Sequence, residues 1–257
     1  MEVALAQASV VVAEPRFLLA VLVAILAGLV RGFSGFGSAL IYVPLVAALY
    51  SPRHAGVSIL IIDFFCTLPL AGKEFRLCNW REVMPVVIGT AIGLPFGVQV
   101  LLMVDPIWLR WAISALIVVF VGLSAVGWKY RGRTNPGIAG GTGLLSGIMT
   151  GAAQMGGPIV VMYWLGTGTD FRQMRANLMV LFILANLIGL LIFFYRGLLS
   201  VEVALFSVMV GLPFFLAIYV GGLLFKGASS TSYVRFVNTA IAFAALISLP
   251  IFEAWLR

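Results

Sequence analysis

Two short glycine-rich stretches combine backbone freedom with polar side chains, and they are related to one another. The first is Gly32–Ser38 (GFSGFGS) and the second is Gly151–Gly157 (GAAQMGG). Gly28, Gly32 and Gly37 recur as Gly147, Gly151 and Gly156 at one spacing of 147 − 28 = 119 residues. Each stretch interrupts an apolar run, and glycine weakens a helix by roughly 1 kcal/mol relative to alanine. We therefore expect two helices that break inside a membrane.

The chemistry that such breaks favour is the binding of an anion. A half-helix that starts inside a membrane has backbone N–H groups without partners and about half a positive charge at its N-terminus. An oxyanion bound there satisfies both needs, and Pro158 fits near the first turn of such a half-helix. We predict that the two breaks face each other across a binding pocket. The predicted substrate-binding residues are Arg31, Gly32, Ser34, Gly35, Phe36, Gly37, Ser38, Thr150, Gly151, Gln154, Met155, Gly156, Gly157, Arg175 and Asn177.

Close helix packing is the alternative interpretation of these glycines. Gly28 with Gly32, and Gly147 with Gly151, have the small-xxx-small spacing that lets membrane helices approach one another. We interpret Gly89, Gly93 and Gly97, which have the same spacing, as packing residues only. In the two breaks the density of glycine and polar residues exceeds what packing needs, which favours a binding site there.

Two charged residues lie inside apolar runs. Arg31 precedes the first break, where it either attracts the anion or extends its side chain to a nearby interface. Asp63 is the candidate for a proton-coupling group, because intramembrane acids are functional hypotheses by default; the alternative is a structural carboxyl. Phe182, its counterpart at 63 + 119, has no charge, so any coupling would be asymmetric.

The composition indicates a polytopic membrane protein. Of the 257 residues, 62% are hydrophobic and 10% are charged, whereas a soluble domain has about 25% charged residues. The net charge is +7. The basic residues that produce it are concentrated in short loops, as the positive-inside rule describes, and do not form a stripe that would bind nucleic acid. Cys66, Cys78 and His54 have no partners at ligand spacing, and no nucleotide-binding or catalytic motif is present. We expect no metal, no cofactor and no enzymatic activity.

The apolar runs predict an all-helical fold with two homologous halves in a single transporter domain. The halves are residues 17–130 and 137–255, and residues 131–136 form a basic linker. Each half has four segments, of which the first contains the break, and such duplication is common among transporters. The segments are Phe17–Tyr50, Ala55–Gly72, Val83–Val104 and Ile107–Tyr130, then Gly137–Gly166, Ala176–Tyr195, Val201–Phe225 and Val234–Trp255.

The broken segments decide whether the two halves are parallel or inverted. If Phe17–Tyr50 crosses the membrane once, the fifteen basic residues other than Arg31 divide nine against six. If it enters and returns as two half-helices, they divide five against ten and the second half is inverted. The larger asymmetry favours the re-entrant, inverted arrangement.

The duplicated halves with their two glycine stretches resemble the sulfite exporter TauE/SafE family of membrane permeases. The resemblance runs from Phe17 to Phe252 and rests on Gly32–Ser38 followed by Pro44-Leu45, and on Gly151–Gly157 followed by Pro158. It implies a secondary transporter that moves sulfite, sulfonates or related oxyanions across the bacterial inner membrane, with export as the expected direction. An anion channel and a carrier for a non-sulfur organic anion remain alternatives. The expected partners are a small anion, coupling protons, the lipid bilayer and, as one possible assembly, a second copy in a homodimer.

Overall fold

The computed structural model describes residues 15–126, 132 and 135–225, and within them every regular element is a helix. The broken first segment forms α2 (Pro15–Ser34) and α3 (Ser38–Leu49), and the broken segment of the second half forms α8 (Pro136–Ala153) and α9 (Gly157–Thr167). The remaining long helices are α4 (Pro52–Thr67), α6 (Trp80–Met103), α7 (Pro106–Ala125), α10 (Phe171–Tyr195) and α11 (Val201–Phe225). The all-helical prediction and both breaks are confirmed. The predicted segment Val234–Trp255 lies outside the described residues.

One helical element was not predicted. The run Ala55–Gly72 continues through the 3-10 turn η1 (Leu68–Leu70) into α5 (Ala71–Leu77), which is bent by 79° from α4. Among the described helices, α2, α6, α10 and α11 are long and apolar enough to span a membrane, and α4 with α5 makes a fifth if the bent pair counts as one span. The chain is therefore a multi-pass membrane protein.

The helix starts follow from local chemistry. Proline is the first residue of α4, α7 and α8, where its missing N–H leaves no hydrogen bond unmade. The residue before each proline is Ser51, Asp105 or Asn135. The side chains of these three residues accept hydrogen bonds from the backbone N–H groups of His54, Ile107 and Gly137, as capping residues do.

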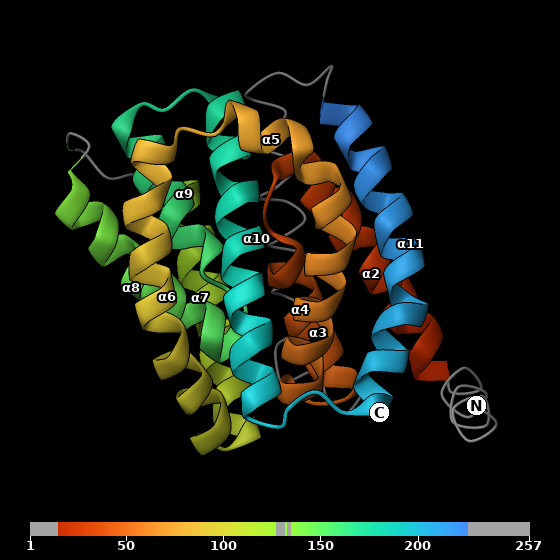
Figure 1. Cartoon of the computed structure of the whole chain (residues 1–257). Helices are drawn as coiled ribbons and strands as arrows, with labels where there is room; N and C mark the ends of the chain where they lie inside the picture. Colours follow the sequence, from red (N-terminus) through yellow and green to blue (C-terminus); the bar gives the residue numbers. More distant parts are fainter. Residues whose placement is uncertain (1–14, 127–131, 133–134, 226–257) are drawn as a thin grey trace.

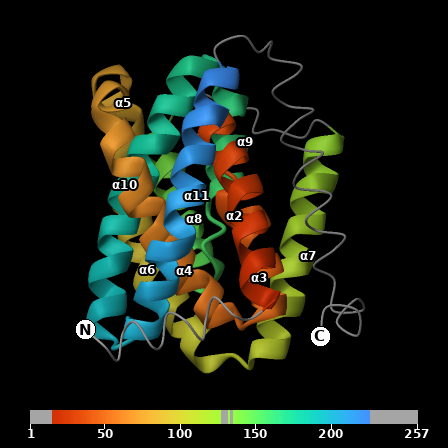
Figure 2. The same cartoon turned by 90° about the vertical axis from the view of Figure 1, so that its right-hand side faces the viewer.

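Two pairs of helices pack closely through glycine. α2 and α11 lie side by side (Figures 1 and 2), and a Cβ atom on Gly32 would lie 2.0 Å from the backbone oxygen of Ile218. α6 and α8 form the second pair, in which a Cβ on Gly93 would lie 2.2 Å from the backbone oxygen of Leu144. Gly89 and Gly97 face α8 in the same way, so the packing role predicted for Gly89, Gly93 and Gly97 is confirmed.

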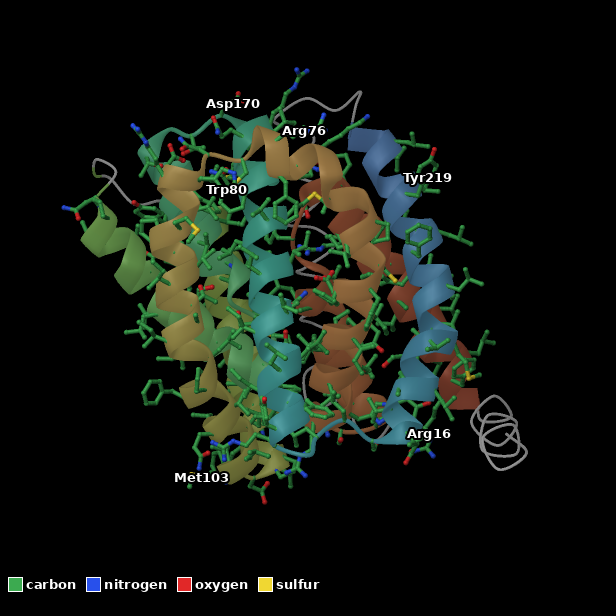
Figure 3. All side chains as sticks on the ribbon, viewed as in Figure 1. Arg16, Arg76, Trp80, Met103, Asp170 and Tyr219 are labelled. Atoms are coloured by element: carbon green, nitrogen blue, oxygen red, sulfur yellow. The ribbon has the colours of Figure 1, made fainter. Side chains whose placement is uncertain are left out.

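The two broken segments enter the fold from opposite ends. Arg16, at the start of α2, and Met103, at the end of α6, lie at the lower end in Figure 3, whereas Trp80 and Asp170 lie at the upper end. The hairpin of α2 and α3 returns to the lower end, where Arg16 Nη1 donates to the Leu49 carbonyl at 3.5 Å. α8 runs parallel to the descending α6, because successive glycines of α6 face successively later residues of α8. α9 then returns to the upper end, just before Asp170.

Candidate functional site

The first break is a tight turn between α2 and α3. Gly35 has φ = +79° and Gly37 has φ = +90°, a left-handed conformation that glycine adopts without steric cost. The Ser34 hydroxyl donates to the Val30 carbonyl at 2.7 Å and accepts a hydrogen bond from the Phe36 N–H at 3.2 Å, which fixes the turn. α3 then starts at Ser38 with no side chain capping its N-terminus. Its first backbone N–H groups therefore receive no capping hydrogen bond from the N-cap residue.

The second break is built differently but ends in the same way. α8 terminates at Gln154, which has φ = +58° and is the one described residue other than glycine with a left-handed backbone. Gly156 fits tightly, because a Cβ there would lie 2.2 Å from Thr150 Oγ1 and 2.4 Å from Ser146 Oγ. α9 starts at Gly157 with Pro158 in its first turn, and no side chain caps its N-terminus. Each break thus presents an uncapped helix start.

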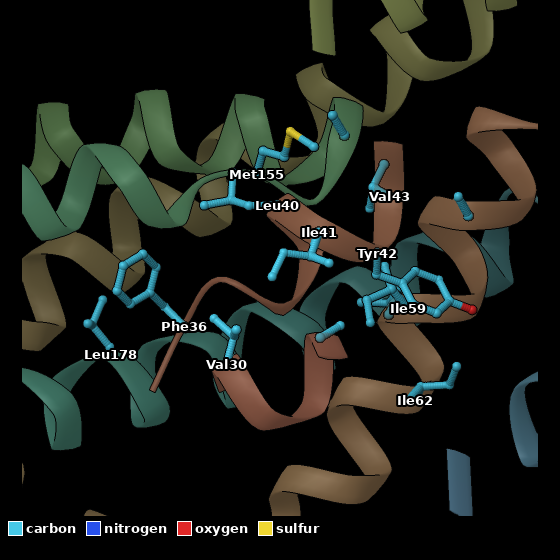
Figure 4. Close-up of a cluster of buried hydrophobic side chains, with 14 of the residues drawn as sticks. Val30, Phe36, Leu40, Ile41, Tyr42, Val43, Ile59, Ile62, Met155 and Leu178 are labelled. Atoms are coloured by element: carbon cyan, nitrogen blue, oxygen red, sulfur yellow. The ribbon is translucent and has the colours of Figure 1, made fainter. Parts of the chain in front are cut away.

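Both helix starts line one small cavity. Its free volume is about 30 Å³, whereas a single water needs about 10–15 Å³ by the same measure. The apolar part of its wall belongs to the buried cluster in Figure 4, which contains Phe36 of the first break, Met155 of the second, Leu40 and Ile59. The cavity is lined by Arg31, Phe36, Gly37, Ser38, Ala39, Leu40, Ile59, Asp63, Thr150, Gln154, Met155, Gly157, Pro158, Phe182 and Asn186.

A buried ion pair forms the charged part of the wall. Arg31 Nη2 donates to Asp63 Oδ2 at 2.8 Å, and the two side chains are only 2% and 8% exposed. Arg31 Nη1 donates to the Gly35 carbonyl, and the guanidinium lies 5.3 Å from the centre of the Phe182 ring. Arg31 therefore stays inside the protein, and the alternative in which it extends to an interface is wrong.

The Asp63 carboxylate also accepts hydrogen bonds from side chains of α3, α4 and α10. Asn186 Nδ2 of α10 donates to Oδ2 at 2.9 Å. The hydroxyl of Ser38, the first residue of α3, and that of Thr67 on α4 donate to Oδ1 at 3.4 and 3.5 Å. The carboxylate therefore lies beside the side chain of the first residue of α3.

Several buried donors in the wall have no partner among the described residues. Arg31 Nε, Thr150 Oγ1 and Gln154 Nε2 belong to this group, and Arg31 and Thr150 are each 2% exposed. Buried polar groups in native proteins nearly always have a partner, because leaving one unpaired costs about 1–3 kcal/mol. These donors, together with two uncapped helix N-termini, match the needs of a small anion. Within the described ranges no three His, Cys, Asp or Glu residues come together as metal ligands would.

Comparison with protein families agrees with this geometry. The family model described as "Sulfite exporter TauE/SafE" matches residues 20–249. The chain belongs to the sulfite exporter TauE/SafE family. It is therefore a membrane transporter of an anionic substrate and not an enzyme. Comparisons with curated proteins and with solved structures found no match.

In this TauE/SafE transporter, part of the predicted binding set lines the cavity and part does not. The predicted residues in the wall are Arg31, Phe36, Gly37, Ser38, Thr150, Gln154, Met155 and Gly157. Gly32 and Gly151 instead face the backbones of α11 and α6, so for these two the packing interpretation is the correct one. Ser34, Gly35 and Gly156 shape the breaks from behind the wall, as their hydrogen bonds and close contacts indicate.

Arg175 and Asn177 lie above the cavity and stabilise its surroundings. Arg175 Nη1 pairs with Glu74 Oε1 of α5 at 2.7 Å, and its Nη2 donates to the Gly32 carbonyl at the end of α2 at 3.0 Å. Asn177 Oδ1 accepts the Asn79 N–H at 2.9 Å, next to the first turn of α6. Neither residue is in the wall of the cavity.

Two wall residues of α10 were not predicted as ligands. Phe182 lacks the charge of Asp63, its counterpart 119 residues earlier, yet its ring lies against the Arg31 guanidinium. Asn186 is a buried amide within the apolar run Ala176–Tyr195. An amide in such a run is the signal that would have identified it, because polar side chains inside membrane helices are rare and need partners.

Proposed function

We propose that this chain is a secondary transporter that exports small sulfur-containing anions across the bacterial inner membrane. The substrates in this proposal are sulfite, sulfonates and related oxyanions, which are compact and carry several acceptor oxygens. The observation that carries the proposal is the small cavity where two uncapped helix N-termini meet the unpartnered donors of Arg31 and Thr150. Family membership supports the sulfur chemistry.

The charge balance of the cavity suits one singly charged anion. Arg31 and Asp63 neutralise each other as an ion pair. Each helix N-terminus contributes about half a positive charge, so two of them together balance about one negative charge. Protonation of Asp63 would leave the positive charge of Arg31 without its counter-ion. The cavity could then balance one more negative charge, which is enough for a dianion.

We also propose that the two halves form an inverted repeat around this site. The packing of α2 on α11 mirrors that of α8 on α6, and in both pairs the helices run parallel through glycine. Residues separated by 119 positions meet at the cavity, as Arg31 with Thr150 (31 + 119 = 150) and Asp63 with Phe182 (63 + 119 = 182). Hairpins that enter from opposite ends support alternating access around a central site.

Asp63 is the proposed site of the coupling proton. It is the acidic residue in the cavity wall, and its oxygens accept hydrogen bonds from Arg31 and from three further side chains. The titratable or charged groups near it are Arg31 on α2, Cys66 on its own helix and, farther off, Arg175 on α10. The groups that α3, α8 and α9 contribute to the wall are uncharged.

Flux into proteoliposomes tests the function. We expect saturable uptake of labelled sulfite, competition by methanesulfonate, and a rate that changes when a pH gradient is imposed across the membrane. A carrier for non-sulfur organic anions would give saturable flux of acetate or lactate that sulfite does not inhibit. Conductance that does not saturate would indicate a channel. Either result would refute the proposed function.

A further inference from the structure

The two helix starts at the cavity differ in one respect. The N-terminus of α3 already has an anion beside it, because the Asp63 carboxylate accepts from the hydroxyl of Ser38 at the start of that helix. The residues that α8 and α9 contribute to the wall are Thr150, Gln154, Met155, Gly157 and Pro158, none of which is charged. The protein therefore supplies its own anion to one half of the site and leaves the other half without one.

The same carboxylate also accepts a hydrogen bond from Arg31, the one cation in the cavity wall. Arg31 uses Nη2 for Asp63 and Nη1 for the Gly35 carbonyl, which leaves Nε as its one nitrogen without a partner among the described residues. A planar guanidinium binds an oxyanion best through two parallel N–H groups. Nε and Nη2 form one such pair, and Nη2 already donates to the Asp63 carboxylate.

From this arrangement we infer that Asp63 is a tethered counter-anion that competes with the transported anion for Arg31. This inference rests on the proposed function and specifies how the site discriminates. The substrate binds against Thr150 and the start of α9, takes Nε and Nη2 of Arg31 and displaces the carboxylate of Asp63. The displaced carboxylate then takes up one proton, so one anion and one proton enter the site together and the net charge of the cavity is conserved.

Neutralising Asp63 should raise the affinity for the anion and, at the same time, remove the proton uptake that accompanies binding. Asp63→Asn removes the competitor and keeps a side chain of the same shape, so the anion should bind more tightly. Linkage makes the effect reciprocal, because a proton on Asp63 must favour the anion by the same factor by which the anion favours the proton. A merely structural aspartate would instead lower affinity when it is replaced, because the site would lose its shape.

Equilibrium binding of labelled sulfite to the purified full-length chain tests this. We expect Asp63→Asn to lower Kd by about fivefold or more, the lower end of typical coupling between sites. Asp105→Asn removes the charge of an exposed acid that caps the start of α7, so it should bind sulfite as the wild type does. An unchanged or raised Kd in Asp63→Asn would overturn the inference.

A second measurement uses the wild-type chain, because Asp63→Asn leaves a buried guanidinium without its counter-ion. Methanesulfonate remains a monoanion over the working pH range, so any proton uptake on its binding comes from the protein. In weakly buffered solution we expect uptake approaching one proton per bound anion. Binding without proton uptake would overturn the inference and leave the proposed function intact. If neither sulfite nor methanesulfonate bound at all, the proposed function itself would fail.

Discussion

Thr150 offers a direct way to separate a ligand-binding donor from a structural one. Its hydroxyl is buried in the cavity wall and has no partner among the described residues. Valine has nearly the same shape but lacks the hydroxyl, so Thr150→Val removes one donor with little change in volume. We expect this substitution to weaken anion binding and, at the same time, to stabilise the protein without ligand.

The two magnitudes follow from the burial of the hydroxyl. A hydrogen bond to a charged group contributes about 1.5–3 kcal/mol, so its loss should raise Kd or KM for sulfite by about 10- to 150-fold. An unpaired buried polar group costs about 1–3 kcal/mol, and its removal should return part of that stability. The ligand-free variant should therefore unfold at a higher temperature than the wild type.

Thr90 provides the matched control on the neighbouring helix. Its hydroxyl is equally buried but donates to the Gly143 carbonyl at 3.1 Å, which links α6 to α8. Thr90→Val should lower stability by about 0.5–1.5 kcal/mol, the typical net contribution of one hydrogen bond, and leave anion affinity unchanged. Both variants can be assayed by thermal unfolding in detergent and by flux in proteoliposomes. If Thr150→Val lost stability and kept its affinity, the hydroxyl would be structural and the assignment of the cavity would be wrong.

Two further predictions concern the fold. Gly93→Ala would place a Cβ 2.2 Å from the Leu144 backbone oxygen and should separate α6 from α8, lowering thermal stability by several degrees; Gly56→Ala, with nothing within 4 Å, should be neutral or stabilising. In a Cys66→Ala background, Arg16→Cys and Arg53→Cys should react with an impermeant maleimide from the same side of the membrane, and Lys73→Cys from the opposite side. Burial and the nearby Glu82 raise the pKa of Cys78 to about 11, so this thiol stays protonated and reacts slowly near pH 7. Labelling of positions 16 and 53 from opposite sides would contradict a re-entrant first hairpin.

The sequence predicts the helices and their breaks well because both depend on local composition. Apolar runs of about 20 residues specify membrane helices, and dense glycine interrupts them, so the positions of α2, α3, α8 and α9 were predictable within a few residues. The element that was missed, α5, is a short polar helix after the bend at Leu68–Leu70. Its sequence has no apolar periodicity, and its position depends on packing against α10.

The sequence predicts only part of the cavity wall, because the wall depends on the direction in which each side chain points from its helix. Gly32 and Ser34 belong to the same motif as Ser38, yet Gly32 faces α11 and Ser34 bonds within its own turn. Arg175 lies four residues from the start of α10, but its side chain reaches upward to Glu74. Spacing along the chain shows that these residues are near the break but cannot show which way they point once other helices have packed.

The two halves of the chain contribute different chemistry to one cavity, and the small size of that cavity gives the reason. The first half supplies the charged pair of Arg31 and Asp63, and the corresponding positions of the second half are Thr150 and Phe182. A symmetric site would hold two such pairs, and each additional buried ion carries a desolvation penalty of several kcal/mol. The free volume of about 30 Å³ has room for about two waters, which are too few to solvate four charges and a substrate. A single ion pair that opens when the anion arrives keeps the cavity near neutrality at each step, and neutral donors from the second half then complete the binding of the substrate.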